Sequence, residues 1–164
     1  VYDERYIRKI RNWMMLLVCS GNTCRSPMAE AIAKHMLAEQ RGLSPEELEA
    51  GGVTVMSAGL FASPGQPATP EAVDALRPMG LDLSGHRSQP VTPEMVQDAD
   101  VVYTMTRRHR EALLELMPSA ADKILPLDPN GDVDDPIGSG PTGYQRCAEL
   151  IRRRLHQRLQ EQQP

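Results

Sequence analysis

A cysteine and an arginine six positions apart enclose the segment that could do chemistry, Cys19-Ser-Gly-Asn-Thr-Cys-Arg25. The segment follows a continuous apolar run, residues 14–18, and precedes a run with helical spacing that opens with Ser26-Pro27. A loop between a strand and a helix turns successive backbone N–H groups inward, and the helix N-terminus adds positive potential. The segment therefore predicts an anion-binding loop with a thiol at its centre.

The residue types inside this loop fit that prediction. Gly21 and Asn22 are the types that most readily adopt the left-handed backbone conformation that such a loop needs. Arg25 has a planar guanidinium that matches two phosphate oxygens. The loop donors favour the thiolate form of Cys19, and the Ser26 hydroxyl is placed to donate to the sulfur as well. We therefore expect a nucleophile and an oxyanion clamp that together bind and attack a phosphoryl group.

Two other interpretations of the cysteines explain less. Only Cys19 and Cys24 could serve as neighbouring zinc ligands, and two ligands are too few for a zinc site. No second cysteine pair or His-x-x-x-His follows, and Cys147 falls in an apolar helical stripe. A disulfide or a pair of buried thiols does not explain why Gly21 and Arg25 stand beside them. We expect neither a metal nor a cofactor.

Phosphoryl transfer also needs an acid for the leaving group. The polar segment 128–143, rich in Gly, Pro and Asp, carries Asp132, Asp134 and Asp135. Proline restricts the residue before it to extended geometry, so Pro136 helps to fix the carboxylate of Asp135. Loop aspartates more commonly form turns or face solvent. The choice of Asp135 therefore depends on the cysteine loop.

The composition fits a single globular domain. The chain has 164 residues, of which 40% are hydrophobic and 24% charged, with a net charge of −4. The basic clusters 107–110 and 152–154 fall in helical patterns, which favours solvated helix faces over a nucleic-acid interface. The apolar run before Cys19 is too short to span a membrane, and the cysteine spacing is not that of a secreted disulfide framework. We expect a cytoplasmic monomer that binds neither nucleic acid nor membrane.

Strand-like apolar runs alternate with helical patterns from residue 14 onward. This alternation predicts an α/β fold, a single-domain three-layer sandwich with a four-stranded parallel sheet flanked by helices. Ligands of such sheets bind at the carboxyl ends of the strands, where Cys19 falls. Residues 1–13 lack a core pattern and are assigned to an N-terminal extension, and 14–164 to the domain. Strands are expected at 14–18, 52–59, 100–105 and 123–127, and helices at 26–42, 68–80 (closed by its glycine), 106–118 and from about 143.

These motifs resemble those of the low-molecular-weight protein tyrosine phosphatases. The resemblance rests on Cys19-(x)5-Arg25-Ser26, on the segments GNTCRSPMAEA and SAGLFASPGQPATPEA and on Asp135-Pro136, and it extends from about residue 14 to 159. It implies that Cys19 forms a phosphocysteine and that Arg25 binds the phosphoryl oxygens. It also implies that Asp135 protonates the leaving group and then activates water, and that phosphorylated proteins are the substrates.

The resemblance implies further roles around the loop. The residues expected to support the loop by hydrogen bonds are Asn22, Ser26, Ser57 and His86, although sequence context alone would make His86 an ordinary surface or packing residue. Cys24 is also a redox candidate, because oxidation could join it to Cys19 on the same loop. The alternative is that Cys24 packs under the loop. The residues expected to bind substrate are Ser20, Gly21, Asn22, Thr23 and Cys24.

Two departures from the tyrosine-specific pattern resemble the bacterial protein arginine phosphatases of the same family. Thr23 stands where a bulky aliphatic residue is usual, and Ile137-Gly138 follow Asp135-Pro136 where aromatic residues are common. A phenyl ring packs well on apolar and aromatic walls, whereas a flat cationic guanidinium needs hydroxyl and carboxylate partners. We expect hydrolysis of phosphoarginine, with phosphotyrosine as the alternative. The alternative that Thr23 is only a turn residue, with no effect on substrate choice, stays open.

Two rival classes of protein also stay open. A thioredoxin-coupled arsenate reductase shares this fold and loop, but it needs further cysteines on a mobile segment, and none occurs between Cys24 and Cys147. A non-catalytic anion-binding module would need neither Cys19 nor Asp135, so a Cys19→Ser protein that kept its biological activity would favour it.

Overall fold

The sheet of this protein is parallel and four-stranded. The computed structural model describes residues 12–162. Residues 1–11 of the predicted extension lie outside the described residues, and Trp13, also assigned to that extension, is instead the first residue of β1 and pairs with Val53. The strands lie in the order β2-β1-β3-β4, with β1 at Trp13–Cys19, β2 at Val53–Gly59, β3 at Val101–Thr104 and β4 at Ile124–Pro126.

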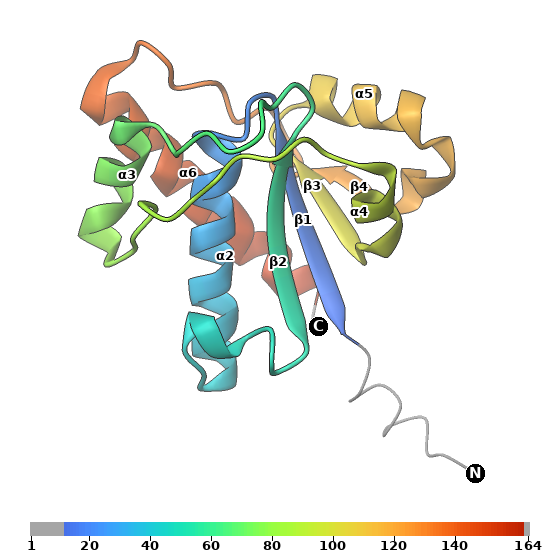
Figure 1. Cartoon of the computed structure of the whole chain (residues 1–164), viewed down its shortest axis with the longest axis horizontal. Helices are drawn as coiled ribbons and strands as arrows, with labels where there is room; N and C mark the ends of the chain where they lie inside the picture. The colour runs from blue at the N-terminus through green and yellow to red at the C-terminus, as the bar shows by residue number, and fades with distance from the viewer. Residues whose placement is uncertain (1–11, 163–164) are drawn as a thin grey trace.

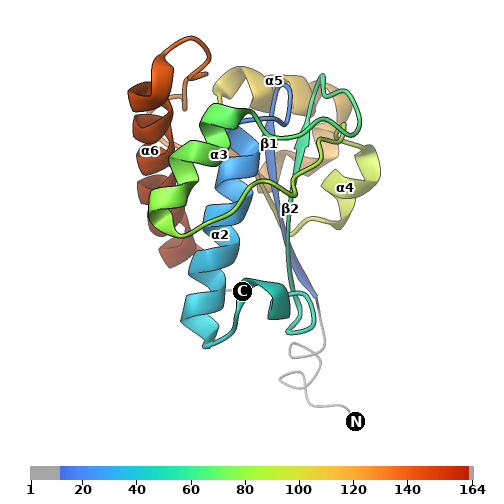
Figure 2. The ribbon, with the colours of Figure 1, turned by 60° about the vertical axis from the view of Figure 1, so that its left-hand side comes forward.

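Helices cover both faces of this sheet (Figure 1). On one face lie α2 (Arg25–Arg41), α3 (Pro70–Leu76) and α6 (Gly140–Glu161), and on the other lie α4 (Pro93–Asp98) and α5 (Arg107–Leu116). Figure 2 shows α2, α3 and α6 side by side in one layer. The structure confirms the predicted three-layer α/β sandwich. The described residues also contain three 3-10 turns, at Pro45–Glu47, Arg77–Met79 and Pro118–Lys123.

The position of β1 inside the sheet, with helices on both faces, explains why its sequence is an unbroken apolar run. Met15, Leu17 and Cys19 belong to the core under α2, α3 and α6, whereas Leu16 and Val18 belong to the core under α4 and α5. A parallel strand covered on both faces must be apolar at every position. Each large side chain buried in this way stabilises the fold by about 1.5–3 kcal/mol relative to an exposed one.

Two helix ends differ from the sequence-based prediction. The helix expected over 68–80 becomes 3-10 after Leu76, because Pro78 has no N–H to donate and disrupts the regular pattern. Its predicted stop is confirmed, since Gly80 closes the turn with a φ of 74°. The last helix begins at Gly140 rather than near Gly143, because Pro141 occupies its first turn, where a proline is tolerated.

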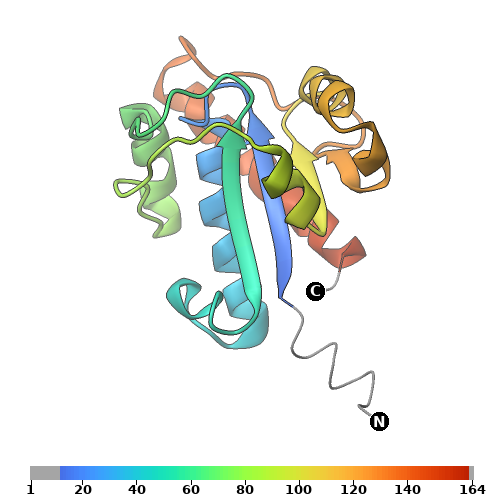
Figure 3. The same cartoon turned by 45° about the vertical axis from the view of Figure 1, so that its right-hand side comes forward.

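The carboxyl ends of the strands form the edge that carries the loops of interest. Figure 3 shows the loop after β1 at this edge, close to the segments that follow β2 and β3 and to the segment that leads into α6. This is the edge at which open parallel sheets bind their ligands. Within residues 12–162, none of the helices combines the length and the apolar character needed to cross a membrane.

Candidate active site

The loop between β1 and α2 surrounds the sulfur of Cys19. The backbone N–H of Asn22 donates to Sγ of Cys19 at 3.3 Å, and Oγ of Ser26 lies 2.9 Å from the same sulfur. Helix α2 begins at Arg25, so its unpaired N–H groups and positive end also face the loop. Cys19 is only 2% exposed. This buried sulfur is therefore surrounded by groups that stabilise an anion.

The backbone of the loop turns at one residue. Asn22 has a φ of 55°, and among residues 12–162 it is the only non-glycine residue with a positive φ. The expectation that Gly21 shares this left-handed conformation is wrong, because the φ of Gly21 is not positive. Asparagine tolerates this conformation better than most side chains, and here its side chain is also engaged in hydrogen bonds, which offsets the strain.

A chain of hydrogen bonds runs from Glu30 to the sulfur. Oγ of Ser57 donates to Oε1 of Glu30 at 2.8 Å, and Nδ2 of Asn22 donates to Oγ of both Ser57 and Ser26 at 2.9 Å. The Ser26 oxygen therefore accepts from Asn22, which leaves its own proton free for Sγ of Cys19. Glu30 was not among the predicted site residues, and its position one helical turn after Ser26 does not indicate the contact with Ser57.

A second segment, residues 86–89, holds Asn22 from the other side. Nε2 of His86 lies 2.7 Å from the backbone oxygen of Asn22. The backbone N–H of Gln89 donates to Oδ1 of Asn22 at 2.9 Å, and its side-chain Nε2 donates to the backbone oxygen of Ser57 at 3.0 Å. The structure thus brings His86 to the loop, and it adds Gln89, for which the sequence held no recognisable signal.

The end of β2 packs directly against the loop. A Cβ at Gly59 would lie 2.5 Å from the backbone oxygen of Ser20 and 2.9 Å from the nitrogen of Asn22, so only glycine fits. The backbone N–H of Phe61 donates to the same Ser20 oxygen at 2.9 Å. This bond places Phe61, whose side chain is 81% exposed, next to the loop.

Arg25 and Asp135, two of the predicted site residues, meet beside the loop. Arg25 is 5% exposed, and its NH1 donates to the backbone oxygen of Val133 at 3.0 Å. Its NH2 lies 3.8 Å from Oδ2 of Asp135, a carboxylate that is 44% exposed. Nε of Arg25 is buried and has no hydrogen-bond partner within residues 12–162. A buried donor without a partner is costly, so this edge of the guanidinium fits an oxyanion.

The three candidate aspartates have different surroundings. Oδ1 of Asp135 lies 3.9 Å from Sγ of Cys24 and accepts the N–H of Ile137 at 3.1 Å. Oδ1 of Asp132 instead accepts the N–H of Arg107, the first residue of α5. Asp134 contacts Sγ of Cys147 through its backbone oxygen only. Asp135 is the carboxylate that faces the loop.

The two other cysteines have thiols that stay protonated at neutral pH. Burial, with the charges of Cys19 and Asp135 adding to it, raises the pKa of Cys24 to about 11. Burial also raises the pKa of Cys147 to about 12. Among the described residues, no three His, Cys, Asp or Glu side chains are grouped as a metal site requires.

His109 is a residue of this site that sequence analysis missed. The cluster 107–110 was expected to be a solvated helix face, and Arg107 and Arg108 are indeed exposed, but His109 is buried. Its Nε2 lies 2.8 Å from Oγ of Ser20. Burial, with the charge of Arg25 adding to it, lowers the pKa of His109 to about 4. Its place three residues after Thr106 is a capping position of the helix, but it does not indicate the contact with Ser20.

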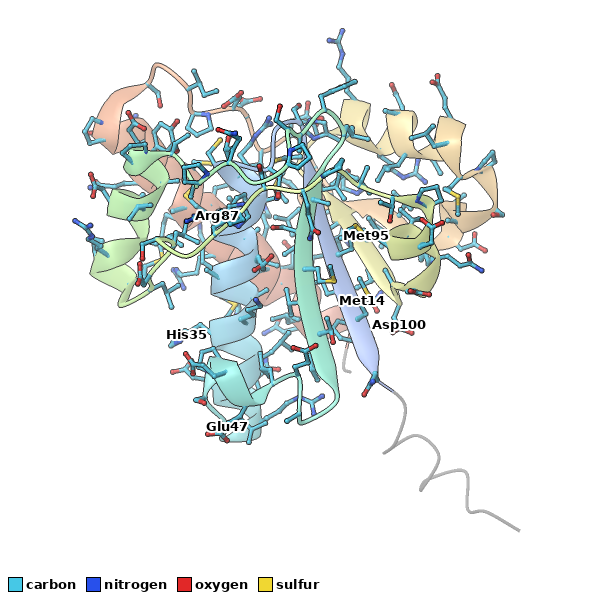
Figure 4. All side chains as sticks on the ribbon, in the orientation of Figure 1. Met14, His35, Glu47, Arg87, Met95 and Asp100 are labelled. Carbon is cyan, nitrogen blue, oxygen red and sulfur yellow. The ribbon has the colours of Figure 1, made fainter. Side chains whose placement is uncertain are left out.

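A groove of about 610 Å³ lies along α2. Glu30, Lys34 and His35 line it from the helix, and residues 80–83, 85 and 86 line it from the opposite segment. Figure 4 shows His35 on α2 below the segment that carries Arg87. Neither Cys19 nor Asp135 lines this groove, so it is not the place where a phosphoryl group would react.

Selective alkylation is expected to distinguish the three cysteines. At pH 7, a thiol with a pKa of about 11 is ionised in roughly one molecule in 10⁴. Iodoacetamide should therefore modify Cys19 first, and phosphate should protect it. Labelling of Cys24 and Cys147 should rise about tenfold per pH unit up to their pKa values. Peptide mapping against time and pH measures the order, and faster labelling of Cys147 at pH 7 would contradict the anion-loop model.

Peroxide is expected to inactivate the protein reversibly. Peroxide would oxidise the Cys19 thiolate to a sulfenic acid, and the Cys24 thiol would then displace water to form a disulfide. Dithiothreitol should restore activity in the native chain but restore less of it in Cys24→Ser. Mass spectrometry of the oxidised protein tests this expectation. Cys19 found as a sulfinic acid with no link to Cys24 would show that Cys24 only packs under the loop.

Comparisons with known proteins agree with this geometry. The family model described as low molecular weight phosphotyrosine protein phosphatase matches residues 14–163. The protein-arginine-phosphatase of Bacillus subtilis (strain 168) is 39% identical over 148 residues, which cover 87% of this chain and 92% of that protein. The probable low molecular weight protein-tyrosine-phosphatase EpsP of Ralstonia nicotianae is 33% identical over 141 residues, covering 85% of this chain and 88% of that protein.

A solved structure extends the comparison to three dimensions. It is the YwlE arginine phosphatase, as a mutant with a phosphorylated active site serine, and its sequence is 36% identical. The match covers 92% of this chain and 97% of that chain, with a TM-score of 0.78. These matches confirm the fold and the family resemblance that the motifs indicated. The chain therefore belongs to the low molecular weight phosphotyrosine protein phosphatase family, and it is a cysteine-dependent phosphatase.

Proposed function

We propose that this protein hydrolyses phosphoarginine in proteins through a phosphocysteine on Cys19. The observation that carries the proposal is the meeting of two groups at the loop. Asp135 stands 3.8 Å from Arg25, beside the loop whose donors hold the sulfur of Cys19. Nucleophile, oxyanion partner and acid thus come from one edge of the sheet.

In the first half of the reaction, the phosphoryl group moves to sulfur. The Cys19 thiolate attacks phosphorus in line, and the bond from phosphorus to the guanidino nitrogen breaks. Arg25 and the loop N–H groups stabilise the phosphoryl oxygens. Asp135 gives its proton to the departing nitrogen. A half-exposed carboxylate suits this role, because the departing group and then the attacking water must both reach it.

In the second half, water releases the phosphate. Asp135, now a carboxylate, takes a proton from a water molecule, whose oxygen attacks phosphorus. The bond from phosphorus to sulfur breaks, and the Cys19 thiolate forms again among its donors. The phosphorylated active site serine of the YwlE mutant supports a covalent intermediate at the equivalent point of this reaction.

Thr23 supports a preference for phosphoarginine. It is half-buried, its backbone oxygen accepts the N–H of Thr69 at 2.9 Å, and its hydroxyl has no hydrogen bond within the described part of the chain. That hydroxyl is available to the N–H groups of a guanidino substrate. Ile137, which follows Asp135-Pro136, is 68% exposed and gives a phenyl ring no aromatic wall. The identity of 39% to a protein-arginine-phosphatase points the same way.

Turnover of phosphoarginine and phosphotyrosine peptides, measured side by side on the native protein, tests this preference. The variant Thr23→Ile should reverse the preference. The change removes a hydrogen bond to a charged group, about 1.5–3 kcal/mol, and adds apolar contact worth roughly 1 kcal/mol per methylene. The ratio of kcat/KM for phosphoarginine to that for phosphotyrosine should fall by about two to three orders of magnitude. Hydrolysis of small aryl phosphates should hold or rise.

Two matched variants separate the causes of that change. Thr23→Ser keeps the hydroxyl and should hold the ratio within a few-fold. Thr23→Val keeps the shape without the hydroxyl and should lose most of the preference. A native protein that already prefers phosphotyrosine peptides would instead be a tyrosine phosphatase of the same family.

The proposal extends to the setting in which the protein works. We infer from composition and cysteine usage that it acts as a monomer in the cytoplasm on phosphorylated proteins. Sedimentation across a range of protein concentrations checks the monomer, and a mass that rises with concentration would contradict it.

A further inference from the structure

His109 touches the catalytic loop from the opposite face of the sheet. It lies in the first turn of α5, and its ring has partners at both nitrogens. The backbone N–H of Thr106 donates to Nδ1 at 3.2 Å, and Oγ of Ser20 lies 2.8 Å from Nε2. A neutral imidazole accepts at one nitrogen and donates from the other. Because Nδ1 accepts, Nε2 carries the proton and donates it to Ser20.

This assignment determines what the Ser20 hydroxyl can do. Its oxygen accepts from His109, so its own proton needs an acceptor elsewhere. Among residues 12–162, no protein group accepts that proton. Ser20 directly follows Cys19 and is half-buried at the loop. The Ser20 proton is therefore available to a ligand bound at the loop.

The surroundings keep His109 in the neutral form that this arrangement needs. Burial and the positive charge of Arg25 lower its pKa to about 4, while Asp132 and Asp135 oppose that shift without cancelling it. Protonation would place a hydrogen on Nδ1, directly opposite the N–H of Thr106. The donor arrangement is therefore stable across the pH range in which phosphatases are assayed.

We propose that His109 is a positioning residue that acts through Ser20. Its Nε2–H holds the Ser20 oxygen so that the Ser20 proton is directed at the phosphoryl group in the Cys19 loop. The inference rests on the proposed phosphocysteine chemistry, but it holds whether the substrate is phosphoarginine or phosphotyrosine. A hydrogen bond to a charged oxygen of this kind is worth about a tenfold change in kcat/KM.

A purely structural role is the competing explanation, and it makes a different prediction. His109 also completes a capping box with Thr106 at the start of α5. Loss of a cap lowers the melting temperature, whatever residue stands at position 20. An effect transmitted through Ser20 must instead disappear when the Ser20 hydroxyl is absent.

A double-mutant cycle separates the two roles. His109→Leu should lower kcat/KM for p-nitrophenyl phosphate about tenfold in the native background and less than twofold in Ser20→Ala. The melting temperature should fall by the same amount in both backgrounds. Thr106→Ala is the matched control. It removes the cap hydroxyl but keeps the backbone N–H, so it should lower the melting temperature and leave kcat/KM unchanged.

Two further measurements remain decisive if His109→Leu folds poorly. His109→Gln, whose amide can also accept and donate, should recover most of the activity. Nitrogen NMR of the native protein should show His109 protonated at Nε2 from pH 5 to 8. A proton on Nδ1, titration near pH 6.5, or equal losses in both backgrounds would overturn the inference. A native protein without phosphatase activity would overturn the proposed function instead.

Discussion

Replacing Cys19 by serine is expected to lower kcat by roughly 10⁴-fold or more on every phosphorylated substrate. A serine hydroxyl is far less acidic than a thiol, so the donors around the sulfur cannot make it a comparable nucleophile. The same donors, namely the Asn22 N–H, the Ser26 hydroxyl and Arg25, remain in place. The variant should therefore still bind phosphorylated peptide. Steady-state kinetics and calorimetric titration with a phosphopeptide check the two halves of this expectation.

The fate of the introduced serine provides a second observation. Any phosphoryl transfer to the hydroxyl of Cys19→Ser should stop at one phosphoryl group per chain, because the less reactive serine ester resists the hydrolysis that regenerates the enzyme. Intact-mass measurement after incubation with substrate detects it. Cys147→Ser is the matched control, since that thiol lies in α6 against Asp134 and should leave turnover unchanged. If Cys19→Ser kept the biological activity, the protein would be an anion-binding module rather than an enzyme.

Replacing Asp135 by asparagine is expected to cut kcat by about 10²–10⁴-fold for substrates with a poor leaving group. The amide keeps the shape of the carboxylate but can neither protonate the departing nitrogen nor take a proton from water. With p-nitrophenyl phosphate the loss in the rate of transfer to sulfur should be smaller, because p-nitrophenolate leaves with little help from an acid. Pre-steady-state kinetics with both substrates separates transfer to sulfur from hydrolysis.

The neighbouring carboxylates provide controls for that variant. Asp134→Asn should have little effect, since Asp134 meets the site through its backbone only. Asp132→Asn should mainly weaken the start of α5, where Asp132 accepts the N–H of Arg107. An equal loss in the rate of phosphoryl transfer to sulfur with all substrates in Asp135→Asn would indicate a structural role. A larger effect at Asp134 would show that the acid is Asp134.

Much of the site could be predicted from the sequence, because its parts are local. The apolar run of β1, the loop and the start of α2 are consecutive, so Cys19, Asn22, Arg25 and Ser26 are brought together by a single strand-loop-helix unit. The alternation of strand and helix patterns along the chain was sufficient to predict a parallel sheet, because the connecting helices cover both of its faces. A strand covered on both faces, such as β1, must be apolar throughout. Asp135 was predicted because a proline follows it in a polar loop.

The tertiary structure alone decided the contacts that cross the sheet. No local pattern shows that His109, in a basic cluster, turns inward to Ser20, or that Gly59 must be glycine because the loop approaches β2. Glu30 and Gln89 join the network for the same reason: their partners lie on other elements, at long sequence separation. The sequence by itself determined which residues of the Cys19 loop we propose for the chemistry, since backbone geometry within one turn positions them. Only the tertiary structure decided what holds them there, because those hydrogen bonds exist only once the strands and helices have packed.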